Sequence, residues 1–295
     1  MSIAVIGAGK WGTALHFALS QKATCKITSR QNKDLKNFVS LEEALACEYL
    51  IFALPAQVVR SWLVEHFIFK GQKILVAAKG IEQGSGKFLN EIFTEFVPKE
   101  NLAFLSGPSF ASEVMQGLPT AVVVNAHNPL LSKEFASFFP LFMKVYASLD
   151  VIGAEVAGAY KNVLAIASGI CDGLSLGNNA RASLIARGLV EMHRFGKYFG
   201  AHDETFLGLS GAGDLFLTAS STLSRNYRVG LFLAEGKSVE EILETLGEVA
   251  EGVFTSKAIL EITQKHAIYT PIAHEIALIL EGKDPRKSVQ DLLAD

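Results

Sequence analysis

The sequence predicts an α/β domain with a parallel sheet, followed by an all-helical domain. Up to about residue 149, short apolar runs alternate with longer amphipathic ones, as they do where helices join the strands of a parallel sheet. After Asp150 the β-branched runs disappear, and helical patterns rich in Ala, Gly and Leu continue to the end of the sequence. We therefore expect two domains, 1–149 and 150–295, each long enough to bury its own core.

The candidate strands are seven short runs of apolar or β-branched residues, most of them followed by Gly, Pro or a helical pattern. Their apolarity is nearly continuous rather than alternating, which indicates strands that are covered on both faces. The runs are 3–6, 26–28, 49–54, 73–78, 102–105, 121–124 and 144–147.

The second half of the sequence contains well-marked helices. Residues 151–174 carry small side chains that let neighbouring helices approach closely, so we expect a central buried helix there. A second helix is expected over 180–199, with apolar residues on one face and an end at Gly200. Ser238, followed three residues later by Glu241, predicts a capping box at the start of a further helix.

Composition and charge exclude several classes of partner. The net charge is -3, with no basic run and no interleaving of aromatic and basic residues, so we expect small-molecule partners and no nucleic acid. The longest apolar stretches, such as 135–143 with Pro140 inside it, are far shorter than the roughly 20 residues of a membrane span. The first strand pattern begins without a basic leader, which makes the cytoplasm the expected compartment.

The cysteines and histidines indicate neither a disulfide framework nor a metal site. Cys25, Cys47 and Cys171 stand far apart with no CxxC pair, so we expect them to be core thiols. The histidines form no pair at metal-ligand spacing and no HExxH pattern. We therefore expect no bound metal.

A glycine-rich turn follows the first predicted strand and opens a helix, which is the context of a dinucleotide-binding fingerprint. Gly7 permits the tight turn, Gly9 lets the backbone approach a pyrophosphate, and Gly12 allows close packing of the helix. The helix N-terminus adds oriented N–H groups and partial positive charge. The turn therefore predicts a Rossmann-type domain that binds NAD or NADP, and its residues are Gly7-Ala8-Gly9-Lys10-Trp11-Gly12.

The choice between NAD and NADP depends on the end of the second strand, where an acidic side chain would bind the ribose 2′-hydroxyl. Here the sequence is Thr28-Ser29-Arg30. Ser29 and Arg30 could hold a 2′-phosphate, which favours NADP. The alternative is a solvated Arg30 in a turn, with Asp34 nearby.

The form Gly-x-Gly-x-Trp-Gly resembles the N-terminal signature of the NAD(P)-dependent glycerol-3-phosphate dehydrogenases of bacterial type. Later motifs agree with that family in order, so the resemblance spans nearly the whole chain. It implies a Rossmann-type domain, a helical domain like that of 6-phosphogluconate dehydrogenase, and a homodimer. The later motifs are Lys79-Gly80, Ser106-Gly107-Pro108-Ser109-Phe110-Ala111, Tyr160-Lys161-Asn162, Gly211-Ala212-Gly213-Asp214, Ser224-Arg225-Asn226 and Val249-Ala250-Glu251-Gly252.

One stretch departs from the family pattern. The family has a longer excursion between the second strand and the segment that corresponds to 39–43, where this chain has only residues 31–38. We therefore expect the helix that packs beside the adenine end of the cofactor to be shortened or missing.

The resemblance implies that Lys161 is the catalytic base and acid, which removes the hydroxyl proton in one direction and returns it in the other. Its apolar neighbours could lower its pKa by desolvation, and a lysine snorkelling from a helix surface is the alternative. Asp214 is implied to orient Lys161 and to contact the substrate, unless it only caps the helix that follows. Thr218, one helical turn later, is expected in the same pocket.

A phosphorylated three-carbon substrate needs an anion receptor, and the resemblance implies Ser224, Arg225 and Asn226 for this role. Arg225 is also implied near the cofactor, whereas a helix cap at Ser224 followed by a solvated arginine is the alternative. Lys79, just beyond a strand, is implied to contact the substrate. There its charge could polarise the reacting oxygen, which makes it a catalytic candidate.

The remaining implied contacts lie in two loops. Gly107 and Ser109 are implied to line the substrate, although Gly-Pro-Ser is also a good turn. For Glu251 the alternative to a cofactor contact is a plain surface carboxylate. The implied cofactor contacts together are Gly7, Gly9, Lys10, Trp11, Gly12, Arg30, Lys79, Ala111, Arg225, Val249 and Glu251.

By this resemblance the expected function is interconversion of sn-glycerol 3-phosphate and dihydroxyacetone phosphate, which would supply glycerol 3-phosphate for phospholipid synthesis. A 3-hydroxyacid or 6-phosphogluconate-type dehydrogenase is the rival enzyme, but those relatives usually lack Gly-x-Trp-Gly together with Ser-Arg-Asn. A non-catalytic NAD(P)-sensing protein is the rival from another class. Intact Lys161 and Asp214 count against it.

Overall fold

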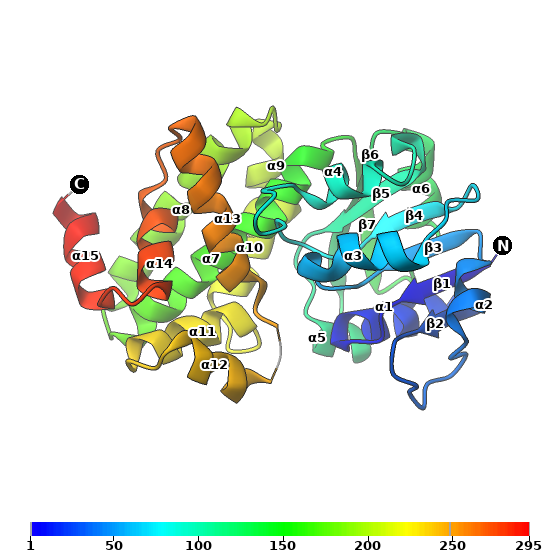
Figure 1. The fold of residues 1–295 in the computed structure, drawn as a ribbon, viewed down its shortest axis with the longest axis horizontal. Helices are drawn as coiled ribbons and strands as arrows, with labels where there is room; N and C mark the ends of the chain where they lie inside the picture. Colours follow the sequence, from blue (N-terminus) through cyan, green and yellow to red (C-terminus); the bar gives the residue numbers. More distant parts are fainter. Residues whose placement is uncertain (1, 248, 295) are drawn as a thin grey trace. The chain divides into compact units, whose positions relative to one another are not determined.

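The computed structural model describes residues 2–247 and 249–294. The chain packs as two compact units. The first comprises the chain up to Lys79 together with Leu89–Glu155, and the second comprises Gly80–Phe88 together with the chain from Val156 onward. The first is built on a sheet flanked by helices and the second on helices, as Figure 1 shows. The predicted fold class, α/β followed by all-helical, is therefore confirmed.

The sheet of the first unit has seven strands in the order β2-β1-β3-β4-β5-β6-β7. The order reverses at β1, which pairs with both β2 and β3, and ligands of such sheets bind at the carboxyl ends of the strands near that point. All seven predicted runs form strands: β1 (Ile3–Ile6), β2 (Cys25–Thr28), β3 (Tyr49–Phe52), β4 (Lys73–Val76), β5 (Leu102–Ser106), β6 (Thr120–Ala126) and β7 (Met143–Ser148).

The sheet is mostly rather than wholly parallel. Strand β6 runs antiparallel to β5, and β7 runs parallel to β6. A parallel crossover needs a dozen or more residues, usually with a helix that returns the chain along the sheet. The connection between β5 and β6 contains only the five-residue helix α5 (Ala111–Met115). Since a helix rises about 1.5 Å per residue, α5 is too short for that return, and the chain enters β6 from the opposite end.

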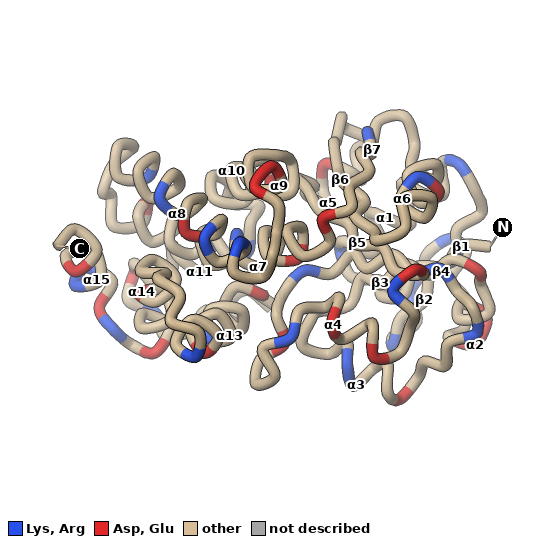
Figure 2. Tube along the Cα trace, turned by 90° about the horizontal axis from the view of Figure 1, so that it is seen from above, with Lys and Arg blue, Asp and Glu red and all other residues tan. Residues whose placement is uncertain are grey.

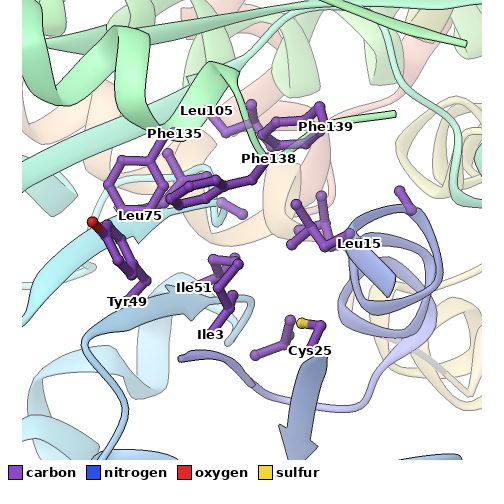
Figure 3. Close-up of a cluster of buried hydrophobic side chains, with 14 of the residues drawn as sticks. Ile3, Leu15, Cys25, Tyr49, Ile51, Leu75, Leu105, Phe135, Phe138 and Phe139 are labelled. Atoms are coloured by element: carbon purple, nitrogen blue, oxygen red, sulfur yellow. The ribbon is translucent and has the colours of Figure 1, made fainter. Parts of the chain in front are cut away.

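Two hydrophobic clusters lie on the two faces of the sheet. Ile3 and Val5 of β1 belong to one cluster, whereas Ala4 and Ile6 belong to the other, as the alternation of a strand requires. Figure 3 shows the first cluster, where the aromatic rings of the α6 region pack over the strands. The predicted cover on both faces is therefore confirmed for β1.

The predicted cover does not extend to β7. This strand forms one edge of the sheet, and its residues Lys144, Tyr146 and Ala147 are exposed. Because β7 has a neighbour on one side only, less of its surface is covered than that of the inner strands. The prediction of burial on both faces is therefore wrong for this strand.

Helices cover both faces of this sheet. Leu15 of α1 packs in the first cluster, and Leu63 of α3 packs in the second. No helix forms between β2 and α2, a stretch that the structure describes in full, which agrees with the shortened excursion noted in the sequence. The helices are α1 (Lys10–Ser20), α2 (Leu41–Leu45), α3 (Ala56–His66), α4 (Leu89–Thr94), α5 and α6 (Pro129–Ala136), with a 3-10 turn at Lys99–Asn101.

Helix α7 (Val151–Gly173), whose residues are almost all buried, begins in the first unit, and its part from Val156 onward forms the centre of the second. A Cβ atom at Gly169 would lie 2.0 Å from the Tyr227 carbonyl oxygen, so the small residues of α7 allow α11 to approach. The predicted central helix is confirmed. The other helices are α8 (Asn178–Tyr198), α9 (Asp203–Leu207), α10 (Asp214–Ala219), α11 (Arg225–Ala234), α12 (Val239–Leu246), α13 (Glu251–His266), α14 (Pro271–Leu280) and α15 (Pro285–Ala294).

Local signals in this unit also hold. Gly200 has a φ of +82° just after α8, which is the left-handed geometry that ends helices. Ser238 and Glu241 form the predicted capping box of α12. The segment Gly80–Phe88 joins this unit as well, with the Phe88 ring centroid 5.2 Å from that of Phe199.

The remaining features concern the distribution of charge, the cysteines, and the two questions of a membrane span and a metal site. Lys and Arg positions are interspersed with Asp and Glu along the trace, as Figure 2 shows. Cys25, Cys47 and Cys171 are buried free thiols, as predicted. Within residues 2–247 and 249–294, no helix is long and apolar enough to cross a bilayer, and no cluster of His, Cys, Asp and Glu could hold a metal ion.

Candidate active site

The phosphate loop of the first unit joins β1 to α1 and has no room for side chains at two of its glycines. A Cβ at Gly7, whose φ is +107°, would lie 2.7 Å from the Ala53 carbonyl oxygen. A Cβ at Gly12 would lie 1.8 Å from the Gly7 carbonyl oxygen. In contrast, the space beside Gly9 is open. The loop is therefore closed on its inner side and accessible at Gly9, as a pyrophosphate requires.

The start of α1 is suited to an anion. Gly9 is the N-cap and, as a glycine, supplies no side-chain cap. The first N–H groups of a helix lack intrahelical partners and point toward its N-terminal end, which makes such an end suited to bind a phosphate. Trp11 is half-buried and donates its indole N–H to the Ala77 carbonyl oxygen at 3.1 Å, which ties the loop to the end of β4. The residues present fit a bound dinucleotide.

The end of β2 carries the candidates for cofactor choice. Thr28 is buried, and Arg30 is exposed in the loop that follows. Lys33, which the sequence analysis did not single out, donates from Nζ to the Ala8 carbonyl oxygen at 2.5 Å. The sequence offered one indication of a role for Lys33, namely that this second cation stands three residues after Arg30.

A second group of candidates meets at the carboxyl ends of β4 and β5. Lys79 donates from Nζ to the Gly107 carbonyl oxygen at 3.3 Å, and Ser109 donates from Oγ to the same oxygen at 3.2 Å. Gly107 has a φ of +101°, and a Cβ there would lie 3.2 Å from the Val122 Cα atom. The loop is therefore held against β6, and Ala111 begins α5 directly after it.

The central feature of the second unit is a buried ion pair. Lys161, on α7, is only 8% exposed. Its Nζ donates to Asp214 Oδ1 at 2.5 Å and to Thr218 Oγ1 at 3.0 Å. The surface-lysine alternative for Lys161 is therefore wrong. The structure brings together three of the predicted residues, from α7 and α10.

A π-helical turn, Leu209–Gly213, delivers Asp214 to this position. A Cβ at Gly211 would lie 2.3 Å from the Phe206 carbonyl oxygen, so only glycine allows the turn to pack there. Asp214 is then the first residue of α10, after the N-cap Gly213, and its carboxylate accepts hydrogen bonds from Lys161 and Thr218. The helix-cap alternative for Asp214 is wrong. Turns of this type are frequent at functional sites.

The Ser224-Arg225-Asn226 segment begins α11. Ser224 accepts a hydrogen bond from the Tyr227 N–H at 3.2 Å, so the helix-cap reading is right for Ser224. Arg225 is exposed. Asn226 is 8% exposed, and its Oδ1 accepts from the Gly252 N–H at 3.0 Å, which links α11 to the start of α13.

The predicted cofactor contacts of this unit lie beside that link. Glu251 is half-buried as the first residue of α13, and Val249 is 39% exposed just before it. A Cβ at Gly252 would lie 2.8 Å from Asn226 Oδ1, so glycine is required at this contact. The predicted residues of the second unit therefore form two groups, one around Lys161 and one around Asn226.

A buried network beside Lys161 was missed by the sequence analysis. Tyr160 donates to Glu191 Oε1 at 2.7 Å, and Glu191 also accepts from the N–H groups of Ile272 and Ala273 at 2.9 and 2.8 Å. Burial raises the pKa of Glu191. This network could have been predicted from the position of Glu191 beside Met192 on the apolar face of the predicted helix. A carboxylate that is buried there needs hydrogen-bond partners inside the protein.

Each unit carries a candidate site of its own. The first has a glycine-rich turn at a helix N-terminus, which suits a pyrophosphate, and the second holds an ammonium group against a carboxylate and a hydroxyl. The fold and these sites define an NAD(P)-dependent oxidoreductase.

Comparison with known proteins identifies the family. The model for the NAD-dependent glycerol-3-phosphate dehydrogenase N-terminus matches residues 28–131, and that for the C-terminus matches residues 150–291. A glycerol-3-phosphate dehydrogenase [NAD(P)+] of Sulfurimonas denitrificans is 65% identical over 293 residues, 99% of each chain. A crystal structure of glycerol-3-phosphate dehydrogenase from Coxiella burnetii matches with a TM-score of 0.91 and 34% identity over 100% of this chain and 99% of that one. The chain belongs to the NAD-dependent glycerol-3-phosphate dehydrogenase family.

Proposed function

We propose that this chain interconverts sn-glycerol 3-phosphate and dihydroxyacetone phosphate with NAD or NADP. The observation that carries the proposal is the buried contact of Lys161 with Asp214 and Thr218. Removing a hydroxyl proton while a hydride leaves the same carbon requires a positioned base, and the reverse reaction requires the corresponding acid. Lys161 is the one residue of the motif set that combines a titratable amine with burial and fixed partners.

Lys161 handles the proton of the reacting oxygen. When bound, the nicotinamide supplies or accepts the hydride at the carbon. In the reductive direction the Lys161 ammonium donates a proton to the ketone oxygen, and in the oxidative direction the neutral amine removes the hydroxyl proton. Asp214 and Thr218 hold Nζ in one position, so the amine does not have to be oriented in each cycle.

The start of α11 is the proposed receptor for the substrate phosphate. Arg225 supplies a planar fork of charged donors, and the Asn226 amide lies beside it with its oxygen already fixed by Gly252. Ser224 accepts a hydrogen bond as the cap of α11, and its hydroxyl hydrogen can still be donated to a phosphate oxygen.

The loops of the first unit carry further proposed contacts. Lys79 and Ser109 both donate to the Gly107 carbonyl oxygen, so a positive charge and a hydroxyl lie together there, a combination that can stabilise negative charge on an oxygen. The proposed cofactor contacts are Gly7, Gly9, Lys10, Trp11, Gly12, Arg30, Lys79, Ala111, Arg225, Val249 and Glu251. We also propose that the enzyme is a cytoplasmic homodimer that supplies glycerol 3-phosphate for phospholipid synthesis.

Oxidation of NADPH and NADH with dihydroxyacetone phosphate tests the function directly. We expect turnover with this ketone and none with a 3-oxo acid of similar size, because only the former offers a phosphate to Arg225 and Asn226. Turnover with the 3-oxo acid alone would favour the rival hydroxyacid dehydrogenase. Nucleotide binding without turnover of either ketone would favour a sensing protein.

A further inference from the structure

Lys33 links the loop after β2 to the phosphate loop, two segments of the nucleotide-binding region that are distant in sequence. It lies in the loop after β2, and its Nζ donates to the carbonyl oxygen of Ala8 in the phosphate loop at 2.5 Å. Ala8 lies between Gly7 and Gly9, at the turn that receives a pyrophosphate. A cation from the β2 loop is therefore held at the edge of the phosphate loop.

The short β2 loop is what holds Lys33 there. The Ile27 N–H donates to the Asn37 carbonyl oxygen at 3.1 Å, and the Val39 N–H donates to the Ile27 carbonyl oxygen at 3.0 Å, so the returning chain runs along β2. Leu35 and Phe38 pack against the hydrophobic cluster of this unit. These contacts fix the course of the backbone after Lys33, which places its side chain within reach of Ala8.

The chemistry around this point suits a phosphate better than a ribose diol. In folds of this kind the side chain after β2 contacts the ribose 2′ position, and an acidic residue there selects the 2′-hydroxyl. This chain has Arg30 instead, and Lys33 adds a second cation from the same loop. Asp34, the acidic residue nearest in sequence, is exposed and adjoins Lys33. Two cations are a receptor for a phosphate monoester, which carries nearly two negative charges.

We propose that Lys33 is a specificity-determining residue that, with Arg30, binds the 2′-phosphate of NADP and makes the chain prefer NADP over NAD. The inference rests on the proposed function in one respect, that a dinucleotide binds in the first unit. Lys33 keeps its contact with Ala8 while further N–H bonds of the ammonium reach the phosphate, since an ammonium group has three donors.

The test is nucleotide binding by Lys33→Met, which keeps the apolar stem and removes the charge. Lys36→Met is the matched control, because Lys36 is an exposed lysine of the same loop. Dissociation constants for NADPH and NADH are measured by fluorescence titration of the full chain. A lost charge-assisted hydrogen bond predicts that the constant for NADPH rises about tenfold or more, whereas that for NADH changes by less than about twofold.

Two further measurements sharpen the result. Adenosine 2′,5′-bisphosphate should lose affinity for Lys33→Met as NADPH does, whereas AMP should not, which places the effect at the 2′-phosphate. The wild-type preference for NADPH should also shrink at high salt, because exposed charges are screened. Thermal unfolding of both variants checks that the loop remains folded.

Three outcomes would overturn the proposal. They are an equal loss for NADPH and NADH in Lys33→Met, no loss for either, and a wild-type protein that binds NADH as tightly as NADPH. A failure of the proposed function looks different. In that case wild-type protein binds NADPH but does not reduce dihydroxyacetone phosphate, and the ratio of NADPH to NADH affinity still decides the role of Lys33.

Discussion

The ammonium of Lys161 and the carboxylate of Asp214, 53 positions apart in the chain, form a hydrogen bond of 2.5 Å with both side chains buried. Removing either charge alone takes from the other, which is buried, its partner in this ion pair. This pairing couples the chemistry of the site to the stability of the second unit, and the two effects can be separated by mutation.

Lys161→Met should lower kcat by at least about a hundredfold, since general acid–base catalysis contributes factors of that order or more. It should also lower the free energy of unfolding by roughly 3–5 kcal/mol, because the buried carboxylate of Asp214 loses its ion pair with Lys161. Lys161→Met with Asp214→Asn should regain most of the stability and none of the activity. Steady-state kinetics and urea unfolding measure the two quantities, and recovery of activity in the double variant would remove Lys161 from catalysis.

Gly9→Ala and Gly12→Ala should fail in different ways. The Cβ of Gly12→Ala would lie 1.8 Å from the Gly7 carbonyl oxygen, so we expect a lower melting temperature and loss of nucleotide binding. The space beside Gly9 is open, so Gly9→Ala should fold normally and bind NADPH more weakly through the crowded pyrophosphate. Calorimetry with and without NADPH distinguishes the two. Unchanged affinity in Gly9→Ala would place the pyrophosphate elsewhere.

Arg225→Ala should raise KM for dihydroxyacetone phosphate by about tenfold or more, since a charged donor to the phosphate is lost. Because Arg225 is exposed, stability should change little. Ser224→Ala is the structural comparison: it removes the cap of α11 and should cost about 1 kcal/mol of unfolding free energy. If Arg225→Ala leaves KM unchanged, the phosphate receptor is not at the start of α11.

The stability of the protein should depend on pH through the carboxyl group of Glu155. Burial raises the pKa of its carboxyl to about 8, although it accepts a hydrogen bond from the Asn90 N–H at 2.9 Å. The folded state therefore holds this proton more tightly than the unfolded state, whose pKa is 4.5. The contribution of this protonated carboxyl to the free energy of unfolding is therefore fully present below about pH 4.5 and is lost as the pH rises through about 8.

Glu155→Gln tests this dependence, because glutamine does not titrate. We expect the free energy of unfolding to fall less steeply between pH 4.5 and 8 in this variant than in the wild type. Urea unfolding at a series of pH values gives both slopes. Identical slopes would mean that Glu155 is ionised in the folded protein throughout this range.

Much of the fold could be predicted because its signals are local. The apolar runs marked all seven strands, Ser238 and Glu241 marked a cap, and the small residues of α7 marked a central helix. Strand direction could not be read in the same way. The reversal at β6 follows from the length of α5, which matters only once the sheet has to be crossed.

The candidate site divides along the same line. The residue types at positions 161, 214 and 225 were visible as motifs, but Glu191 and Lys33 were not, because each acts through a partner distant in sequence. Ser224 and Asp214 show most clearly what local sequence cannot decide. The sequence allowed either residue to be a helix N-cap, but in the structure Ser224 is the N-cap of α11 and Asp214 is the first residue of α10.

By itself the sequence determined where the chain turns, which segments are strands or helices, and which residues carry charge or hydroxyl groups. These properties depend on backbone geometry and side-chain spacing over a few residues. Only the tertiary structure decided that Asp214 contacts Lys161 rather than its own helix end, and that Lys33 folds back to Ala8. The physical reason is that a polar group chooses among partners according to which of them packing brings within about 3 Å, and packing depends on the whole chain.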